Sequence, residues 1–241
     1  MTGAFLNALG ILLGSLIGIA WRGPISLRAQ LMLRNLLGLA TLGFGIRLIY
    51  LSVGGTFLTV LKELILAILA LTLGNALGKL CRLQKLSNRL GRIAAASIGD
   101  AQKNPARKSD GLNACIILFC ASPLGIMGAV TSGLADYFYF LAIKGVMDAL
   151  AMIGFMKLFR WTAAFSAFPV FLFLGSISFA CQFYALPLLA AHQLVHLIDA
   201  TAGFMSFAIA IMIFEIRKVE LANYLPSLVI APLLAWLLGG S

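Results

Sequence analysis

Eight apolar runs, most of them close to 20 residues long, leave this chain few ways to fold. A helix needs about 20 mostly apolar residues to cross the hydrocarbon of a bilayer. The runs cover 4–21, 33–52, 58–78, 112–132, 138–158, 163–183, 187–215 and 220–239. Because 61% of the residues are hydrophobic and only 11% are charged, most of the protein's surface is suited to lipid rather than water. We expect an all-α, polytopic transmembrane helical bundle with about eight spans, forming one integral membrane domain over 1–241.

Three short stretches of the first half of the chain recur in the second half, in the same order. LGSLIG (13–18) resembles LGSISF (174–179), ATLGF (40–44) resembles ATAGF (200–204), and KELIL (62–66) is weakly echoed by VELAN (219–223). If spans 1–3 recur as spans 6–8, the two triplets have opposite orientations, an arrangement common in transporters. Duplication retained only for packing is the alternative.

With such an inverted repeat, the chain divides into four parts. These are a first three-span repeat at 4–80, a basic cytoplasmic connection at 81–110, two connecting spans at 111–160, and a second three-span repeat at 163–241.

The positive charges predict how the spans are oriented. Fifteen of the 18 basic residues fall in odd-numbered connections or at the span edges beside them, and only Arg47, Lys62 and Lys144 lie elsewhere. Since cytoplasmic connections carry the excess of lysine and arginine, both termini are predicted to be periplasmic. The expected location is the bacterial inner (plasma) membrane. The net charge of +10 therefore reflects membrane orientation, and no nucleic-acid partner is expected.

The longest connection has a pattern of its own. Apolar residues recur at helical spacing beside a stripe of basic residues: Leu83, Leu86, Leu90 and Ile93, with Arg82, Lys85, Arg89 and Arg92. A short helix on the cytoplasmic leaflet would bury the first face and bind anionic lipid through the basic 82–92 segment. A solvated loop is the alternative. Residues 99–110 are polar and contain a proline, which predicts a flexible loop.

The fifth span carries an ammonium and a carboxylate, Lys144 and Asp148, four residues apart on one helix face. A charge within a span costs about 2.5–3.5 kcal/mol, so its position is informative. Asp148 follows Asp136 by roughly 18 Å at helical rise, which places it near the midplane. Either the pair only neutralises itself, or Asp148 binds a cation or proton for which Lys144 competes. We favour the second interpretation because two apolar residues would insert at less cost.

The seventh span places His192, His196 and Asp199 on one predicted helix face, with Asp199 near mid-membrane. The histidine spacing is compatible with a metal, with a proton relay, or with packing at an outer vestibule. We assign no metal and no cofactor. The sequence also contains no hydrolase, metalloprotease or nucleotide-binding motif, and no enzymatic activity is expected.

Several motifs are similar to those of one bacterial family. They are Gly3, Asn7, Gly14 and Gly18 near the N-terminus, Lys144 with Asp148, PVFLFLGS (169–176) and NYLPSLVIAPL (223–233). Over nearly its whole length the chain resembles the YqgA/YdfK-like integral membrane proteins, domain of unknown function family 554. Leu174 replaces a residue that is often glutamine there, and ASPLGIMGA (121–129) replaces a glycine-rich stretch. The resemblance implies a membrane protein and an important Lys144–Asp148 pair, and it carries no activity.

We therefore expect a transporter or channel for a small ion or small solute that works without ATP hydrolysis. The candidate pathway residues are Lys144, Asp148, Asp199, Asn7, His192, His196 and Asn223. The alternative is a membrane scaffold or lipid-interacting protein with no transport activity, and an enzyme acting on a lipid or a peptide ranks third. The expected partners are the lipid bilayer and a small ion or solute, and a homo-oligomer is left open.

Overall fold

The computed structural model describes residues 1–20, 23, 26–103, 108–192 and 194–239. These residues form helices and short connections, with no β-strand among them, so the all-α prediction is confirmed. The helices are α1 (Thr2–Ala20), α2 (Leu27–Ser52), α3 (Phe57–Leu80), α4 (Leu83–Lys103), α5 (Lys108–Cys120), α6 (Pro123–Leu134), α7 (Tyr139–Phe159), α8 (Trp161–Ala164), α9 (Ala167–Ala180), η1 (Cys181–Ala185), α10 (Leu186–Ala191), α11 (Val195–Ile213), η2 (Leu221–Tyr224) and α12 (Ser227–Gly239).

Seven helical runs within the described residues are long and apolar enough to cross a membrane. They are α1, α2, α3, α7, Trp161–Ala191, α11 and Leu221–Leu238. The helices α5 and α6 supply an eighth if the bent pair is one span, with 55° between its two parts. A polytopic helical membrane fold, as predicted from the apolar runs, is therefore confirmed.

Pro123 explains why the fourth span is broken. Proline has no N–H and clashes with the preceding turn, so it ends one helix and is well suited to begin the next. The chain does this here: α5 ends at Cys120 and α6 begins at Pro123. The Ser122 carbonyl then accepts hydrogen bonds from the backbone N–H groups of Gly125 and Ile126.

The predicted boundary between the sixth and seventh spans is wrong. The sequence placed it between residues 183 and 187, but the helical run continues from Trp161 to Ala191, and α11 begins only at Val195. The π-helix η1 ends at Ala185, two residues before Pro187, and the helical run continues through this interruption into α10. The break therefore lies after Ala191 and before Val195.

The loop predicted at 99–110 is also largely wrong. The helix α4 continues to Lys103 and α5 starts at Lys108, while residues 104–107 lie outside the described part of the chain. The amphipathic periodicity that begins at Leu83 thus extends over 21 residues, and of the two alternatives for this connection a helix forms. Arg22 and Arg107, which belong to the count of basic residues, are likewise outside the described residues.

The chain divides into two compact units. Unit 1 comprises Met1–Pro24, Lys85–Gly133 and Tyr137–Phe179, and unit 2 comprises Ile25–Gln84, Leu134–Asp136 and Ala180–Ser241.

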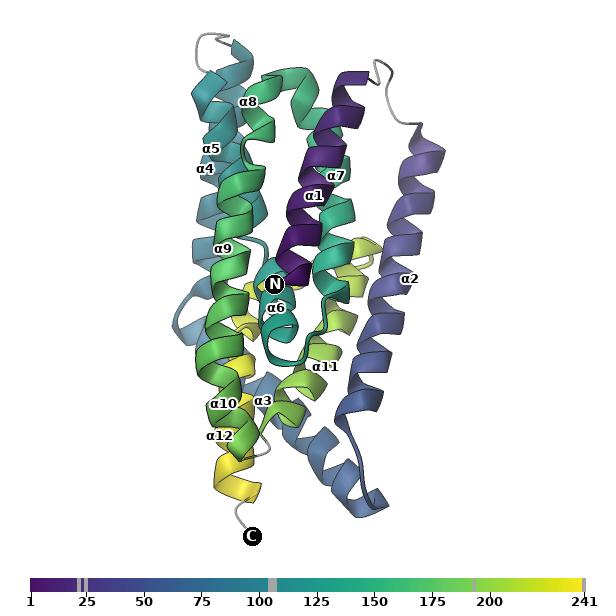
Figure 1. The fold of residues 1–241 in the computed structure, drawn as a ribbon, viewed down its shortest axis with the longest axis vertical. Coiled ribbons are helices and arrows are strands. Elements are labelled where there is room, and N and C mark those ends of the chain that lie inside the picture. The colour runs from purple at the N-terminus through teal and green to yellow at the C-terminus, as the bar shows by residue number, and fades with distance from the viewer. Residues whose placement is uncertain (21–22, 24–25, 104–107, 193, 240–241) are drawn as a thin grey trace. The chain divides into compact units, whose positions relative to one another are not determined.

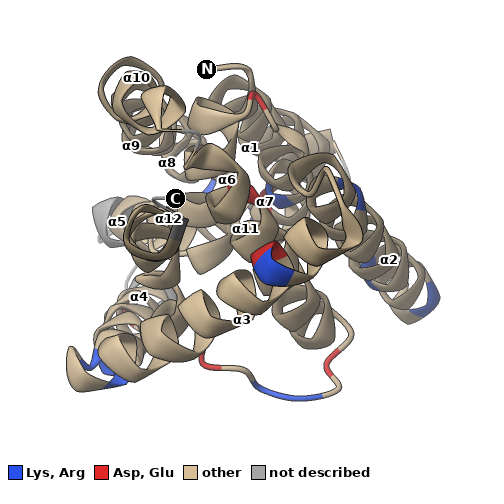
Figure 2. Ribbon diagram, turned by 90° about the horizontal axis from the view of Figure 1, so that it is seen from below, with Lys and Arg blue, Asp and Glu red and all other residues tan. Residues whose placement is uncertain are grey.

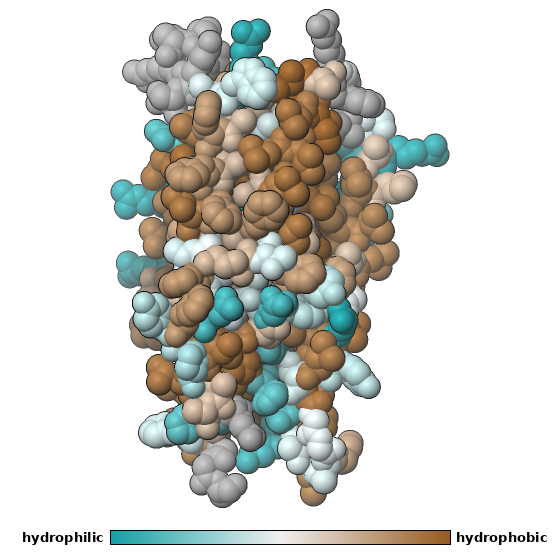
Figure 3. Space-filling view, in the orientation of Figure 1, coloured by the Kyte–Doolittle hydropathy of each residue, from teal (hydrophilic) through white to brown (hydrophobic). Residues whose placement is uncertain are grey.

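In unit 1, α1 and α7 lie side by side and run parallel (Figure 1). The close approaches follow the same direction on both helices: Gly3 faces Leu141, Gly10 faces Gly145, and Gly18 faces Ile153. Small residues four apart on α1 let the two backbones approach closely. On the opposite face of α1 large apolar residues such as Phe5, Leu12 and Leu16 are exposed, and Figure 3 shows an apolar surface over α1 and α9. This surface suits lipid.

In unit 2, two antiparallel helix pairs carry the packing. On α2 and α11, Gly38 faces Phe214 and Gly45 faces Gly203 and Ser206. On α3 and α12, Gly74 faces Ser227, and Gly78 faces Asn223 just before α12. The connection after α11 is irregular and charged: Figure 2 shows basic residues between acidic ones, and Arg34 of α2 pairs with Glu215 at its start.

The inverted repeat remains a prediction. Within unit 2, the matched threonines Thr41 and Thr201 are both fully buried, and each hydroxyl donates to the carbonyl four residues earlier. The matched glycines differ, however, because a side chain on Gly43 would meet open space whereas Gly203 packs against α2. The similarity is thus local in this unit.

Candidate functional site

The packing of α1 on α7 brings Asn7 next to the charged pair of the fifth span. A Cβ on Gly145 would lie 3.1 Å from the Cα of Asn7, so the two backbones nearly touch at this level. The absence of a side chain at Gly145 allows the short Asn7 amide to reach the next turn of α7, where Asp148 lies. The site therefore depends on the glycine contacts as well as on its polar residues.

Asp148 is bonded by two partners at the middle of unit 1. Its Oδ2 accepts a hydrogen bond of 2.8 Å from Asn7 Nδ2 and forms an ion pair with Lys144 Nζ. Asn7 is 0% exposed, Lys144 1% and Asp148 8%. Asp148 is the tenth of the 21 residues of α7, close to the midpoint predicted from the sequence. The sequence-predicted residues Asn7, Lys144 and Asp148 are thus one buried cluster.

The broken span supplies neighbours that the sequence analysis missed. The Lys144 ammonium lies 5.7 Å from the centroid of the Phe119 ring, in the last turn of α5. A Cβ on Gly125, near the start of α6, would lie 2.7 Å from Lys144 Cε, so the lysine stem occupies the space that this glycine leaves. Gly125 also lies near Leu174 of α9. Apolar helices contain many such residues, and only the fold distinguishes these three.

One acceptor of the cluster is not satisfied. Asn7 Oδ1 is buried and has no hydrogen-bond partner among the described residues. A buried carbonyl oxygen without a donor costs about 1–3 kcal/mol, which is unusual in a native structure and calls for a physical reason. The oxygen belongs to the amide group that bonds Asp148, and a cation that reached both the carboxylate and this oxygen would satisfy it.

Asp199 and the two histidines do not form the predicted face. His192 lies in the break after α10, whereas His196 and Asp199 belong to α11. The prediction that all three residues share one face of one helix is therefore wrong. Both histidines are exposed. Asp199 is 6% exposed, and its Oδ1 has no hydrogen-bond partner in the described part of the chain. As the fifth residue of α11, it also lies nearer the end of its span than predicted.

Asn223 has structural partners at both ends of its amide. In unit 2 its Oδ1 accepts from the Gln84 backbone N–H at 3.0 Å, and its Nδ2 donates to Glu220 at 2.8 Å. The Gln84 side chain in turn accepts from the Ala222 backbone N–H at 3.1 Å. These bonds join Gln84, at the start of α4, to η2, which explains Asn223 without a ligand.

Comparison with known proteins places the chain in a family. The model of the family described as "Protein of unknown function (DUF554)" matches residues 2–236. The chain belongs to DUF554. It is 26% identical over 238 residues to the uncharacterised membrane protein YdfK of Bacillus subtilis (strain 168), covering 99% of this chain and 97% of that protein. It is 28% identical over 231 residues to the uncharacterised protein YqgA of Escherichia coli (strain K12), covering 95% and 94%.

The family membership agrees with the predicted resemblance, and no solved structure matches the chain. Both alignments cover almost the full length of the relative and of this chain. The name of YdfK identifies a membrane protein, and neither name states an activity.

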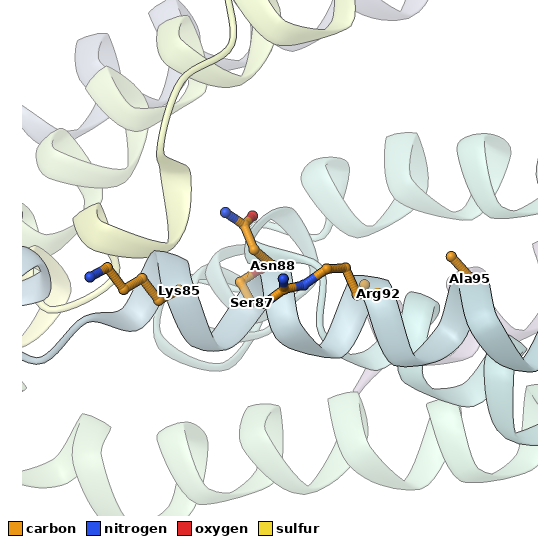
Figure 4. Close-up of a pocket in the computed structure, with 6 residues that line it drawn as sticks. Lys85, Ser87, Asn88, Arg92 and Ala95 are labelled. Atoms are coloured by element: carbon orange, nitrogen blue, oxygen red, sulfur yellow. The ribbon is translucent and has the colours of Figure 1, made fainter.

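A second polar feature of this DUF554 chain lies on α4. Figure 4 shows Lys85, Asn88 and Arg92 along one side of the helix, and they line a hollow of about 630 Å³ together with Ser87, Gly91 and Ala95. Leu86 and Ile93 of the same helix are exposed. The combination of a cationic hollow and exposed apolar side chains is suited to an amphiphilic anion.

Proposed function

We propose that this protein moves a small ion or small solute across the bacterial inner membrane without hydrolysing ATP. The buried cluster of Asn7, Lys144 and Asp148 carries this proposal. Ionisable groups within a span are costly and mark substrate or ion pathways more often than packing sites. Asn7 Oδ1 has no partner among the described residues, so the cluster contains an acceptor that a ligand could use. We assign the protein no catalytic role.

The broken fourth span supports a pathway at this cluster. Transporter sites near the bilayer midplane are typically formed by discontinuous helices, whose free backbone groups contact the substrate. In unit 1, the last turn of α5 places Phe119 beside Lys144, and the start of α6 places Gly125 against the lysine stem. The site thus combines a buried ion pair with an interrupted helix.

The helix directions support eight crossings with both termini in the periplasm. Because α2 and α3 each cross once, α7 can run parallel to α1 only if the bent pair α5–α6 also crosses. The antiparallel packing of α2 on α11 requires the same crossing. With eight crossings the basic connections fall on one side, which the positive-inside rule assigns to the cytoplasm. Residues 240–241, at the predicted periplasmic C-terminus, lie outside the described part of the chain.

A lipid-interacting role is the second candidate, and the hollow on α4 favours it. Lys85 and Arg92 present two positive charges beside exposed apolar side chains on the same helix. In this alternative, α4 binds anionic lipid headgroups and the buried pair serves assembly only. The basic 82–92 segment is also a plausible lipid contact of a transporter, so the two functions are separated by flux and not by lipid binding.

The test is ion flux in sealed proteoliposomes. Uptake of radioactive sodium and rubidium and the response of an internal pH-sensitive dye are measured for the wild type and for Lys144→Met/Asp148→Asn. The double variant removes both charges together and so avoids an unpaired buried charge. Lys157→Met is the matched control, because Lys157 is an exposed lysine on the same helix α7.

We expect flux from the wild type and from Lys157→Met, and a loss of about tenfold or more from the double variant. A double variant that is folded and transports as well as the wild type would refute a role of the pair. Absence of flux from every protein, with lipid binding that depends on Lys85 and Arg92, would favour the lipid-interacting alternative.

A further inference from the structure

We propose that Asp148 and Asn7 bind one dehydrated monovalent cation, and that the Lys144 ammonium is a tethered competitor that leaves the carboxylate when the cation enters. The inference rests on the proposed transport function and names its substrate class. It starts from the observation that the carboxylate already holds a cation, which is covalently attached to the protein.

The charge of the site matches a monovalent cation. Asp148 contributes a single negative charge, and Asn7 contributes a neutral carbonyl oxygen. Divalent ions such as calcium take six to eight oxygen ligands, several of them carboxylates. Within the described residues no three His, Cys, Asp or Glu side chains come together in a way that would hold a metal ion. One carboxylate is therefore matched to one positive charge.

The unsatisfied oxygen indicates where the cation binds. Asn7 Oδ1 belongs to a side chain with 0% exposure, so bulk water does not solvate it. The nitrogen of the same amide donates to Asp148 Oδ2. The amide group of Asn7 is therefore held against the carboxylate. Lys144 has only donors, and its ammonium is bonded to Asp148. A cation beside Asp148 would supply the positive charge that this acceptor lacks.

The broken span offers the displaced ammonium a second position. The Phe119 ring, 5.7 Å from Lys144 Nζ, attracts a cation through its face. Phe119 is in the last turn of α5, where backbone carbonyls lack intrahelical partners and the helix dipole is negative. The lysine stem passes Gly125, where no side chain obstructs its movement. Moving from Asp148 toward the end of α5 therefore keeps the ammonium next to negative potential.

The exchange follows from the cost of unpaired charge. An ion pair that loses one partner in an apolar interior leaves an uncompensated charge, which is strongly unfavourable. With the cation on Asp148 and the ammonium at the ring and the end of α5, each charge keeps a compensating group. Lys144 thereby weakens cation binding in the resting protein and helps the cation to leave.

The experiment measures how cations stabilise the purified full-length protein. Thermal unfolding is followed in sodium, potassium or lithium chloride, against N-methylglucamine chloride at equal ionic strength. A ligand that binds the folded state raises its stability in proportion to ln(1 + [L]/Kd), so each titration yields a half-saturating concentration. The variants are Lys144→Met, Lys144→Arg, Asn7→Ala and Lys144→Met/Asp148→Asn, and Lys157→Met is the control.

We expect Lys144→Met to lower the half-saturating concentration of at least one cation by about tenfold, a typical coupling between competing ligands. Lys144→Arg, which keeps a positive charge beside Asp148, is expected to bind no more tightly than the wild type. The double variant and Asn7→Ala should lose the cation-specific effect. If Lys144→Met does not fold, the comparison of Asn7→Ala with the wild type tests the proposal. Thermal stability should then depend on the identity of the cation in the wild type and not in Asn7→Ala.

Equal cation dependence in the wild type, Lys144→Met and the double variant would overturn the inference. With that result, the proposed transport function would still hold if proteoliposomes show flux that requires Asp148. Conversely, cation binding with the expected pattern but no flux would refute transport and keep the site. The two failures are therefore distinguishable.

Discussion

The backbones of Gly45 on α2 and Gly203 on α11 are in close contact, and each glycine faces the carbonyl oxygen of the other. A Cβ on Gly45 would lie 3.0 Å from the Gly203 carbonyl oxygen, and a Cβ on Gly203 would lie 2.9 Å from the Gly45 carbonyl oxygen. Neither oxygen can move without shifting a helix. Since small residues at helix interfaces take the place of a hydrophobic driving force in lipid, this contact is central to the packing of unit 2.

Gly45→Ala and Gly203→Ala should each destabilise the protein by about 1–3 kcal/mol, the usual cost of overpacking a close contact. Gly43→Ala is the control, because a side chain there meets nothing within 4 Å although the residue lies only two positions from Gly45. It should be neutral, or stabilising by up to about 1 kcal/mol through its helix propensity. Thermal unfolding in detergent measures all three, and equal effects at Gly43 and Gly45 would contradict the observed interface.

Gly10→Ala should disturb the candidate site from a distance of one turn. The added methyl group would meet the backbone of Gly145 on α7, so α1 must move away and the Asn7 amide with it. We expect reduced stability together with a loss of flux or cation dependence. Gly154→Ala, on the same helix α7 but facing open space, is the control and should change neither. Normal function in a stable Gly10→Ala protein would show that the site does not need this contact.

The buried ion pair should show strong thermodynamic coupling. In N-methylglucamine chloride, where no small cation replaces the ammonium, Asp148→Asn and Lys144→Met each remove one partner of the pair and should cost about 3–5 kcal/mol, while the double variant recovers most of this loss. The Arg34–Glu215 pair in unit 2, in which Arg34 is half-buried and Glu215 is exposed, is the comparison, with a smaller expected cost of about 1 kcal/mol. Chemical unfolding of the four proteins of each cycle provides the coupling energies. Additive losses at Lys144 and Asp148 would show that the two charges do not depend on each other.

Labelling of single cysteines should confirm the orientation. In a variant without the four native cysteines, Arg89→Cys on α4 should react with a membrane-impermeant reagent only from the cytoplasmic side. Gly54→Cys, in the exposed connection between α2 and α3, should react only from the periplasmic side. Labelling of both positions from the same side would exclude the eight-crossing topology.

The apolar runs and the basic connections were sufficient to predict the membrane class of the protein. Their information is local: about 20 apolar residues cannot be solvated by water, whatever they pack against. The pair Lys144–Asp148 could be predicted for the same reason, because an i, i+4 spacing places two side chains together on any helix. The family motifs added Asn7, although nothing in the sequence indicates that Asn7 bonds Asp148 across 141 positions.

Only the tertiary structure decided which residues surround these groups and where the helices break. The sequence ended the sixth span at residue 183, yet the helical run continues to Ala191, and the break that follows separates His192 from His196. The contacts of Phe119 and Gly125 with Lys144 join different helices, and an apolar residue in a span shows no periodicity that would reveal them. The physical reason is that hydropathy specifies the solvent of a helix, whereas close backbone packing selects its neighbours.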